Sequence, residues 1–241
     1  MRILIITIVL FVLPLKMVAQ NPTIFLNADK SYSIDAVNPK QDKRISHIVK
    51  NHTKGETATF IVRFIGANTD AVGNAMVFRY KEPELKGNAN EDAELQTILH
   101  VNKVKRKRKS LAKRIIKFIN EYKAEAKYTN IVNSIVPISK ATSNELFVYY
   151  FTDGIESSKD YRMLDVYPFK SVKHAIEAAK KDAVKLKSKY GLSDTLHGIK
   201  KIVFFIPVQM DHKKKGSDFI EEYFSEIFRL FQVRKVEFNT F

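Results

Sequence analysis

Residues 23–33 read TIFLNADKSYS, a short apolar run that ends in Asp29 and continues with Ser31 and Ser33. The run Ile24–Leu26 shows no alternation with polar residues, which is typical of a strand buried on both faces in a mostly parallel sheet. Asp29 then falls at the carboxyl end of that strand, where open α/β sheets place their ligand sites. A carboxylate with hydroxyls two and four residues later supplies the oxygen ligands that Mg²⁺ prefers. The same residue types are common in caps and turns, so the triplet alone leaves both interpretations open.

Strand-like and helix-like segments alternate along the rest of the chain, and this alternation predicts an α/β protein. The expected strands after the first are Thr57–Ile65, Ala75–Tyr80, Leu146–Phe151, Ile202–Val208 and Val233–Phe238. The expected helices are Pro39–Thr53, Glu91–Lys127 with a break near Val101–Val104, Tyr128–Val136, Ser171–Tyr190 and Phe219–Phe231. A short polar connection joins the second and third strands, which indicates an antiparallel hairpin.

The first twenty residues have the pattern of a secretory signal peptide, with Arg2, an uncharged apolar run over Ile3–Leu15, and Lys16. The run is too short to cross a bilayer, which needs about 20 apolar residues. We expect cleavage near Ala19 or Gln20, and we favour it over retention as an N-terminal membrane tether. Either outcome places residues 21–241, expected as a single domain without a membrane span, in an extracytoplasmic space, periplasmic or secreted.

The composition favours anionic partners and disfavours several kinds of enzyme. Lys and Arg number 41 against 26 Asp and Glu, a formal net charge of +15. The absence of cysteine excludes disulfides, thiolate metal sites and a cysteine nucleophile. The chain has no G-x-S-x-G elbow, phosphate-binding glycine loop or dinucleotide motif, so we expect no enzyme and no small-molecule substrate. A metal-dependent phosphoester hydrolase is the remotest alternative, because no general base stands out.

The helix expected over residues 91–127 has two contrasting faces. Its core-facing stripe repeats at three- and four-residue steps: Leu111, Ile115, Ile119 and Tyr122. Its other face is strongly basic: Lys103, Lys105, Arg106, Lys107, Arg108, Lys109, Lys113, Arg114 and Lys117. A solvated helix face explains such a cluster without any ligand. The alternative is a docking patch for a polyanion, namely nucleic acid, an acidic glycan, anionic lipid head groups or an acidic protein. The cluster contains no aromatic residue, which disfavours binding of single strands by base stacking.

Two further residues with oxygen-bearing side chains, Asp153 and Thr129, stand at the ends of predicted elements. The run LFVYYF at residues 146–151 is another doubly buried strand and ends in Thr152-Asp153-Gly154, while Thr129 stands at a helix start between the two strands. This order of D-x-S-x-S, Thr and T-D-G resembles the von Willebrand factor A domain with its metal-ion-dependent adhesion site, over roughly residues 23–241. The resemblance implies a three-layer, Rossmann-like α/β fold, with a mostly parallel central sheet, one antiparallel edge strand and helices on both faces.

The resemblance also implies a role for each site residue. Ser31 and Ser33 would bind Mg²⁺, or Mn²⁺ or Ca²⁺, directly, joined by Thr129 in the ligand-ready state. Asp29 and Asp153 would hold coordinating waters. An exposed Asp or Glu of a partner protein would then fill an open position on the ion, which makes the expected function adhesion. The alternative function is a basic, exported, polyanion-binding protein in which the metal site is vestigial.

Overall fold

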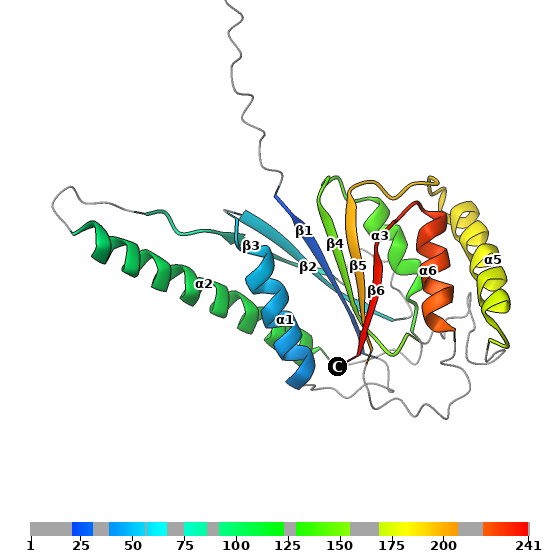
Figure 1. Cartoon of the computed structure of the whole chain (residues 1–241), viewed down its shortest axis with the longest axis horizontal. Helices are drawn as coiled ribbons and strands as arrows, with labels where there is room; N and C mark the ends of the chain where they lie inside the picture. The colour runs from blue at the N-terminus through cyan, green and yellow to red at the C-terminus, as the bar shows by residue number, and fades with distance from the viewer. Residues whose placement is uncertain are drawn as a thin grey trace, which may run out of the picture.

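Six strands form one sheet in the order β3-β2-β1-β4-β5-β6, with helices on both faces (Figure 1). The computed structural model describes residues 21–30, 39–55, 57–66, 75–85, 92–122, 129–154, 169–206 and 219–240. The strands are β1 (Thr23–Asp29), β2 (Thr57–Ile65), β3 (Ala75–Lys81), β4 (Leu146–Phe151), β5 (Ile199–Ile206) and β6 (Val236–Thr240). The helices are α1 (Pro39–His52), α2 (Ala93–Glu121), the 3-10 helix η2 (Val132–Ser134), α3 (Ile135–Ser139), α5 (Val172–Tyr190) and α6 (Ile220–Leu230).

The pairing of the strands confirms the predicted fold class. β2 and the edge strand β3 run antiparallel, as the predicted hairpin requires, and the other neighbouring strands run parallel. The chain is therefore an α/β protein with a mostly parallel sheet, one antiparallel edge strand and a layer of helices on each side. None of the helices in the described ranges is long and apolar enough to span a bilayer.

The order of the strands reverses at the centre of the sheet. From β1 the chain adds β2 and β3 on one side, and it then returns to add β4, β5 and β6 on the other side. Phe25 therefore lies between Ile61 of β2 and Val148 of β4. Open α/β sheets bind ligands outside the carboxyl ends of the strands at such a reversal, because the connections there leave in opposite directions. The fold thus marks the ends of β1 and β4 as the place to look for a site.

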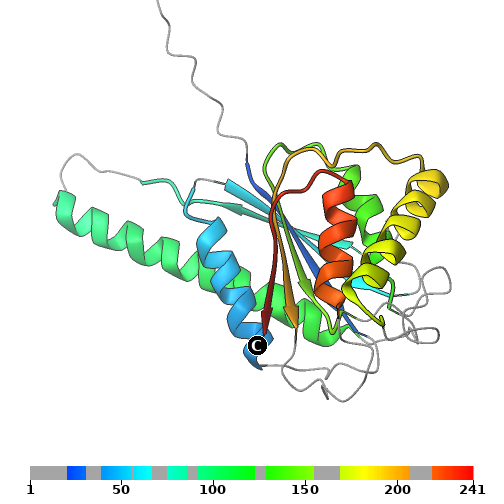
Figure 2. The same cartoon turned by 45° about the vertical axis from the view of Figure 1, so that its right-hand side comes forward.

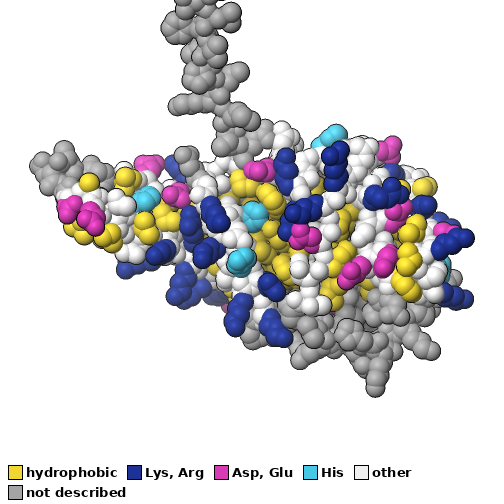
Figure 3. Space-filling view, in the orientation of Figure 1, with side chains coloured by type: hydrophobic (Ala, Val, Ile, Leu, Met, Phe, Trp, Pro, Cys, Tyr) yellow, Lys and Arg dark blue, Asp and Glu magenta, His cyan; other side chains and the backbone are white. Residues whose placement is uncertain are grey.

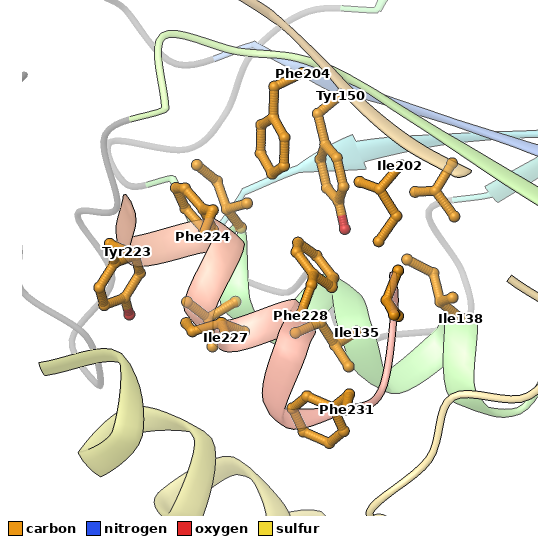
Figure 4. Packing of buried hydrophobic residues seen from close by; sticks show 14 of the residues in the cluster. Ile135, Ile138, Tyr150, Ile202, Phe204, Tyr223, Phe224, Ile227, Phe228 and Phe231 are labelled. Atoms are coloured by element: carbon orange, nitrogen blue, oxygen red, sulfur yellow. The ribbon is translucent and has the colours of Figure 1, made fainter. Parts of the chain in front are cut away.

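Each face of the sheet packs against its own helices. Helices α1 and α2 cover the face that carries Ile24 and Leu26, whereas α3, α5 and α6 cover the face that carries Phe25 and Tyr150. On this second face the rings of Tyr150 and Phe204 stack with centroids 4.5 Å apart and point toward α6 (Figure 4). Two apolar layers of this kind are what strands buried on both faces require.

Helix α2 differs from the sequence-based expectation because it is unbroken from Ala93 to Glu121. The expected break near Val101–Val104 was wrong, since the helix contains neither Pro nor Gly and Val104 is buried in line with Leu111 and Ile115. The C-terminal part of α2 packs on the sheet, while its N-terminal part extends beyond the sheet in both views (Figures 1 and 2).

The short helix expected to end at Val136 continues as α3 to Ser139. Pro137 lies inside it, at the third position of its first turn. A helix tolerates proline there because the N–H groups of the first turn have no partner within the helix, so the missing N–H removes no helical hydrogen bond. The expected end at Val136 was therefore too early, because the proline does not stop the helix.

Helix α1 ends in a largely buried histidine. The Nε2 atom of His52 lies 2.7 Å from the Tyr149 hydroxyl, and its ring centroid lies 4.3 Å from that of Phe147. Burial, helped by the charge of Lys201, lowers the pKa of His52 to about 4, and burial raises the pKa of Tyr149 to about 12. His52 is therefore neutral in the folded protein at pH values where an unfolded histidine is protonated.

Stability should fall as the pH is lowered from about 6.5 toward 4, because the unfolded chain then binds a proton at His52 that the folded chain does not. We expect a loss of about 1–2 kcal/mol from this residue after allowance for its partial exposure to solvent. Urea unfolding at pH 7 and pH 5 measures the loss. The variant His52→Gln keeps a hydrogen-bonding side chain but does not titrate, so its stability should depend less on pH. Identical pH dependence in the two proteins would contradict the assignment.

Candidate functional site

The ends of β1 and β4 lie side by side and are joined by a side-chain hydrogen bond. Ala28 is opposite Phe151 in the parallel pair, so the next residues, Asp29 and Thr152, leave the sheet together. The Thr152 hydroxyl donates to Asp29 Oδ2 at 2.8 Å and accepts from the backbone N–H of Gly154 at 3.1 Å. Asp29 is 2% exposed and Thr152 is fully buried. The carboxylate of Asp29 is therefore held in one orientation at the strand reversal.

Thr129 reaches the same carboxylate from the segment before α3. Its Oγ1 lies 3.3 Å from Asp29 Oδ2 and 3.4 Å from Oδ1, and the residue is 3% exposed. Thr129 stands three residues before η2 rather than at the first helical residue. The Asn130 side chain accepts from the Asn133 N–H at 3.1 Å, which fixes the turn that presents Thr129. Residues 100 positions apart in sequence thus meet at one carboxylate.

The same turn is fastened to β4. The Ser134 hydroxyl lies 2.7 Å from the Tyr150 hydroxyl, deep in the core. Burial raises the pKa of Tyr150 well above its usual value, so the phenol keeps its proton and remains able to donate a hydrogen bond. This contact sets the position of the Thr129 segment relative to the strand that leads to Asp153.

Asp153 follows Thr152 at the end of β4 and is 5% exposed. The glycine after it is required by the backbone: Gly154 has φ of +78°, and a Cβ there would lie 2.9 Å from the Ile220 side chain. The T-D-G sequence therefore turns the chain sharply off the sheet while α6 packs against the turn. Asp153 is left at the carboxyl edge that also carries Asp29.

Of the five predicted metal-site residues, the structure brings Asp29 and Thr129 into contact and carries Asp153 to the same edge. Ser31 and Ser33 lie outside the described residues, and their roles stay predictions. No group of three or more His, Cys, Asp or Glu side chains is placed to hold a metal within the described ranges. A cation at this edge would therefore depend on hydroxyl oxygens as well as on the two aspartates.

Thr152 was missed as a site residue by the sequence reasoning. The available signal was its place directly before Asp153, at the end of the strand that pairs with β1. The contact itself depends on the register of β1 with β4, in which Ala28 lies opposite Phe151, and only the structure gives this register.

Two residues of opposite charge, Lys30 and Asp42, lie close together beside this edge. Burial lowers the pKa of Lys30, with the nearby charge of Asp42 opposing the shift. Burial likewise raises the pKa of Asp42, opposed by a hydrogen bond from Asn120 and by the charge of Lys30. Successive residues of a strand point to opposite faces, so Lys30 belongs to the layer of α1 and α2 while Asp29 faces α3.

The basic residues predicted as a polyanion patch all lie on α2. Eight of them are exposed: Lys103, Lys105, Arg106, Lys107, Lys109, Lys113, Arg114 and Lys117. Arg108 differs, because its guanidinium turns toward the body, donates to the Thr53 carbonyl at 2.5 Å and lies 3.5 Å from the Glu82 carboxylate. Arg108 therefore helps to attach α2 to the domain, and its charge is only partly available to a ligand.

Replacing Thr152 by Val should remove both hydrogen bonds of its hydroxyl while keeping the shape of the side chain. Because the Asp29 carboxylate and the Gly154 N–H would lose a partner in a buried place, we expect a loss of about 1–3 kcal/mol in the free energy of unfolding. Thr152→Ser, which keeps the hydroxyl, is the matched control and should lose less. Urea denaturation measures both, and equal stability of the Val variant and the original protein would contradict this account.

No family model matches the chain, and no curated protein matches it. Among solved structures, the pilus adhesin SpaC from Lactobacillus rhamnosus GG aligns with 12% identity and a TM-score of 0.41 over 90% of this chain and 28% of that one. The D319A mutant of the minor pilin PilB from Streptococcus sanguinis aligns with 12% identity and a TM-score of 0.43, over 92% and 57%. The human COPII-coat protein Sec24c aligns with 9% identity and a TM-score of 0.41, over 92% and 30%. The chain thus spans less than two thirds of each of these structures, and the similarity assigns no function.

Proposed function

We propose that the chain is a von Willebrand factor A-like interaction module of an extracytoplasmic space, which binds a divalent cation at the carboxyl edge of its sheet and captures an acidic side chain of a partner protein. The observation that carries the proposal is the meeting of Asp29 with Thr129 and Thr152 at the reversal of strand order. A buried carboxylate shared by two hydroxyls is a feature that helix capping alone does not explain.

The chemistry of these residues fits a hard cation. Carboxylate and hydroxyl oxygens suit Mg²⁺ or Mn²⁺ better than soft metals, and Ca²⁺ would need more oxygen ligands than the named residues supply. In the proposed arrangement Ser31, Ser33 and Thr129 bind the ion, while Asp29 and Asp153 hold its waters. A bound ion would supply an electrophilic centre with one position open to a carboxylate.

The residues described above have a role of their own in this arrangement. Thr152 holds the Asp29 carboxylate in place beside the Thr129 hydroxyl. The Asn130 and Ser134 contacts hold the Thr129 turn. The site is thus oriented by hydrogen bonds that need no cation, which lowers the entropy lost on binding one. No catalytic step forms part of the proposal.

Binding of Mg²⁺ or Mn²⁺ alone should stabilise the folded protein. At an ion concentration of about one hundred times Kd the gain is about 2.7 kcal/mol, which is several degrees in Tm. Asp29→Asn and Asp153→Asn should lose most of this gain, whereas Asp194→Asn, at an exposed carboxylate paired with Lys187, should keep it. Thermal unfolding with Mg²⁺ and with EDTA gives the comparison. An equal ion-dependent gain in Asp29→Asn would place the cation elsewhere.

Capture of a protein partner should depend on the same residues. In a pull-down from the native envelope, a partner bound in Mg²⁺ should be released by EDTA and should be absent with Asp29→Asn. The Asp194→Asn variant should capture it normally. A partner retained equally in EDTA and by Asp29→Asn would remove the cation from the mechanism.

A further inference from the structure

The first three turns of α2 extend past the sheet, and His100 within them lies 3.5 Å from Glu82 of the segment after β3. Four large aliphatic side chains lie in these turns, and all are exposed: Leu95 (51%), Ile98 (51%), Leu99 (55%) and Val101 (43%). The buried residues of α2 begin only at Val104. Figures 1 and 2 show this part of the helix extending past the sheet, and Figure 3 shows hydrophobic side chains at its free end. We call residues 93–103 the arm.

The outward side of α2 combines these apolar residues with the basic ones. Leu95, Leu99, Arg106, Lys109 and Lys113 follow one another at intervals of three, four or seven residues, which places them on one stripe of the helix. This stripe lies opposite the buried one, because nine residues, or two and a half turns, separate its first member from the first buried residue. The stripe from Leu95 to Lys113 is about 27 Å long, with apolar side chains at the tip and cations from Arg106 onward.

The balance of charge on the helix is strongly one-sided. Between residues 93 and 117 stand nine Lys or Arg and a single acid, Glu94. The acidic residue before the helix, Asp92, is used as its N-cap and accepts from the Glu94 N–H at 2.9 Å. The basic stripe is therefore not neutralised by acids on its own helix, apart from the exposed pair of Lys117 with Glu121 at the far end.

We propose that this face of α2 docks on an anionic lipid bilayer, with the apolar tip entering the boundary of head groups and acyl chains and the basic residues lying among the head groups. A helix that carries exposed aliphatic residues together with Lys and Arg has the properties of an interfacial helix. A charged polymer such as nucleic acid would contact the basic residues and leave the aliphatic tip in water. A second copy of the chain would bring two strongly basic faces together.

The natural composition allows a local measurement. The chain contains no Trp, so Leu99→Trp gives a single fluorescent reporter on the arm, and Val184→Trp, 67% exposed on α5 in the opposite layer, gives a matched control. A local reporter is needed because the apolar run at residues 3–15 of the full chain can itself bind lipid. With vesicles of phosphatidylcholine and phosphatidylglycerol, the emission of the Leu99→Trp variant should shift to the blue and resist aqueous quenchers. The emission of the Val184→Trp variant should not change.

Two further variants separate the apolar and basic contributions. Leu95→Ser combined with Leu99→Ser should lower the partition coefficient to the anionic vesicles at least about tenfold. Reversal of charge at Lys105, Arg106 and Lys109 should lower it about a hundredfold or more. All five positions are exposed, so both variants should keep the Tm of the original protein. For the reporter on the arm, pure phosphatidylcholine vesicles should give little shift.

Several results would overturn the proposal. One is an unchanged emission spectrum of the Leu99→Trp variant while the protein is bound to anionic vesicles. Another is retention on heparin or DNA that falls with charge reversal but not with the two Ser substitutions, in the absence of vesicle binding, which would make α2 a polyanion-binding face. A blue shift that appears without lipid and grows with protein concentration would instead identify a contact between two copies. These outcomes are independent of the cation site, which the Asp29→Asn variant tests.

Discussion

The hydrogen bond from Thr152 to Asp29 is the contact on which the proposed site depends, and it follows from the parallel pairing of β1 with β4. Two strands from distant parts of the chain end together, and the residue just past one end meets the residue at the other. Both partners are buried, so the bond is worth more than it would be in water, and its loss would leave polar atoms without partners. The orientation of the Asp29 carboxylate, and through it the place of Thr129, is therefore a property of the sheet.

The surroundings of this bond are unusually polar for the interior of a sheet. Asn27 is fully buried on β1, two residues before Asp29 and on the same face, and its register partners are Arg63 and Tyr150. Arg63 is itself only 4% exposed. Polar groups in such places cost stability unless they are paired, and a purely structural sheet would be expected to carry aliphatic residues here. These buried polar residues lie just beneath the strand ends where Asp29 and Thr152 meet.

Much of the fold could be predicted from the sequence, because its signals are local. The runs TIFLNAD and LFVYYF identified strands buried on both faces, the segment Ser171–Tyr190 identified α5, and the connection between β2 and β3 indicated the hairpin. The errors arose where a local signal was weak or ambiguous. The short helix continues past Pro137, which sits in its first turn, and the break expected near Val101–Val104 falls in a helix that has no breaking residue.

The site was only partly predictable for a different reason. Asp29 and Asp153 were found because they end recognisable strands, and Thr129 because it stands at an expected helix start. The contact of Thr152 with Asp29 depends on register, which sequence patterns do not specify. The inward turn of Arg108 could not be predicted either, since it depends on a carbonyl just after α1 and on Glu82 after β3.

The unbroken course of α2 has a mechanical consequence. One rigid rod runs from the projecting leucines to Asn120, whose side chain contacts Asp42, the partner of Lys30, the residue next to Asp29. An α-helix resists bending over such a length, so a force applied at its free end is transmitted along its axis to the neighbourhood of the strand tips. One straight element thus joins the exposed apolar tip of the arm to Asp42 and Lys30 on the α1 and α2 side of the sheet.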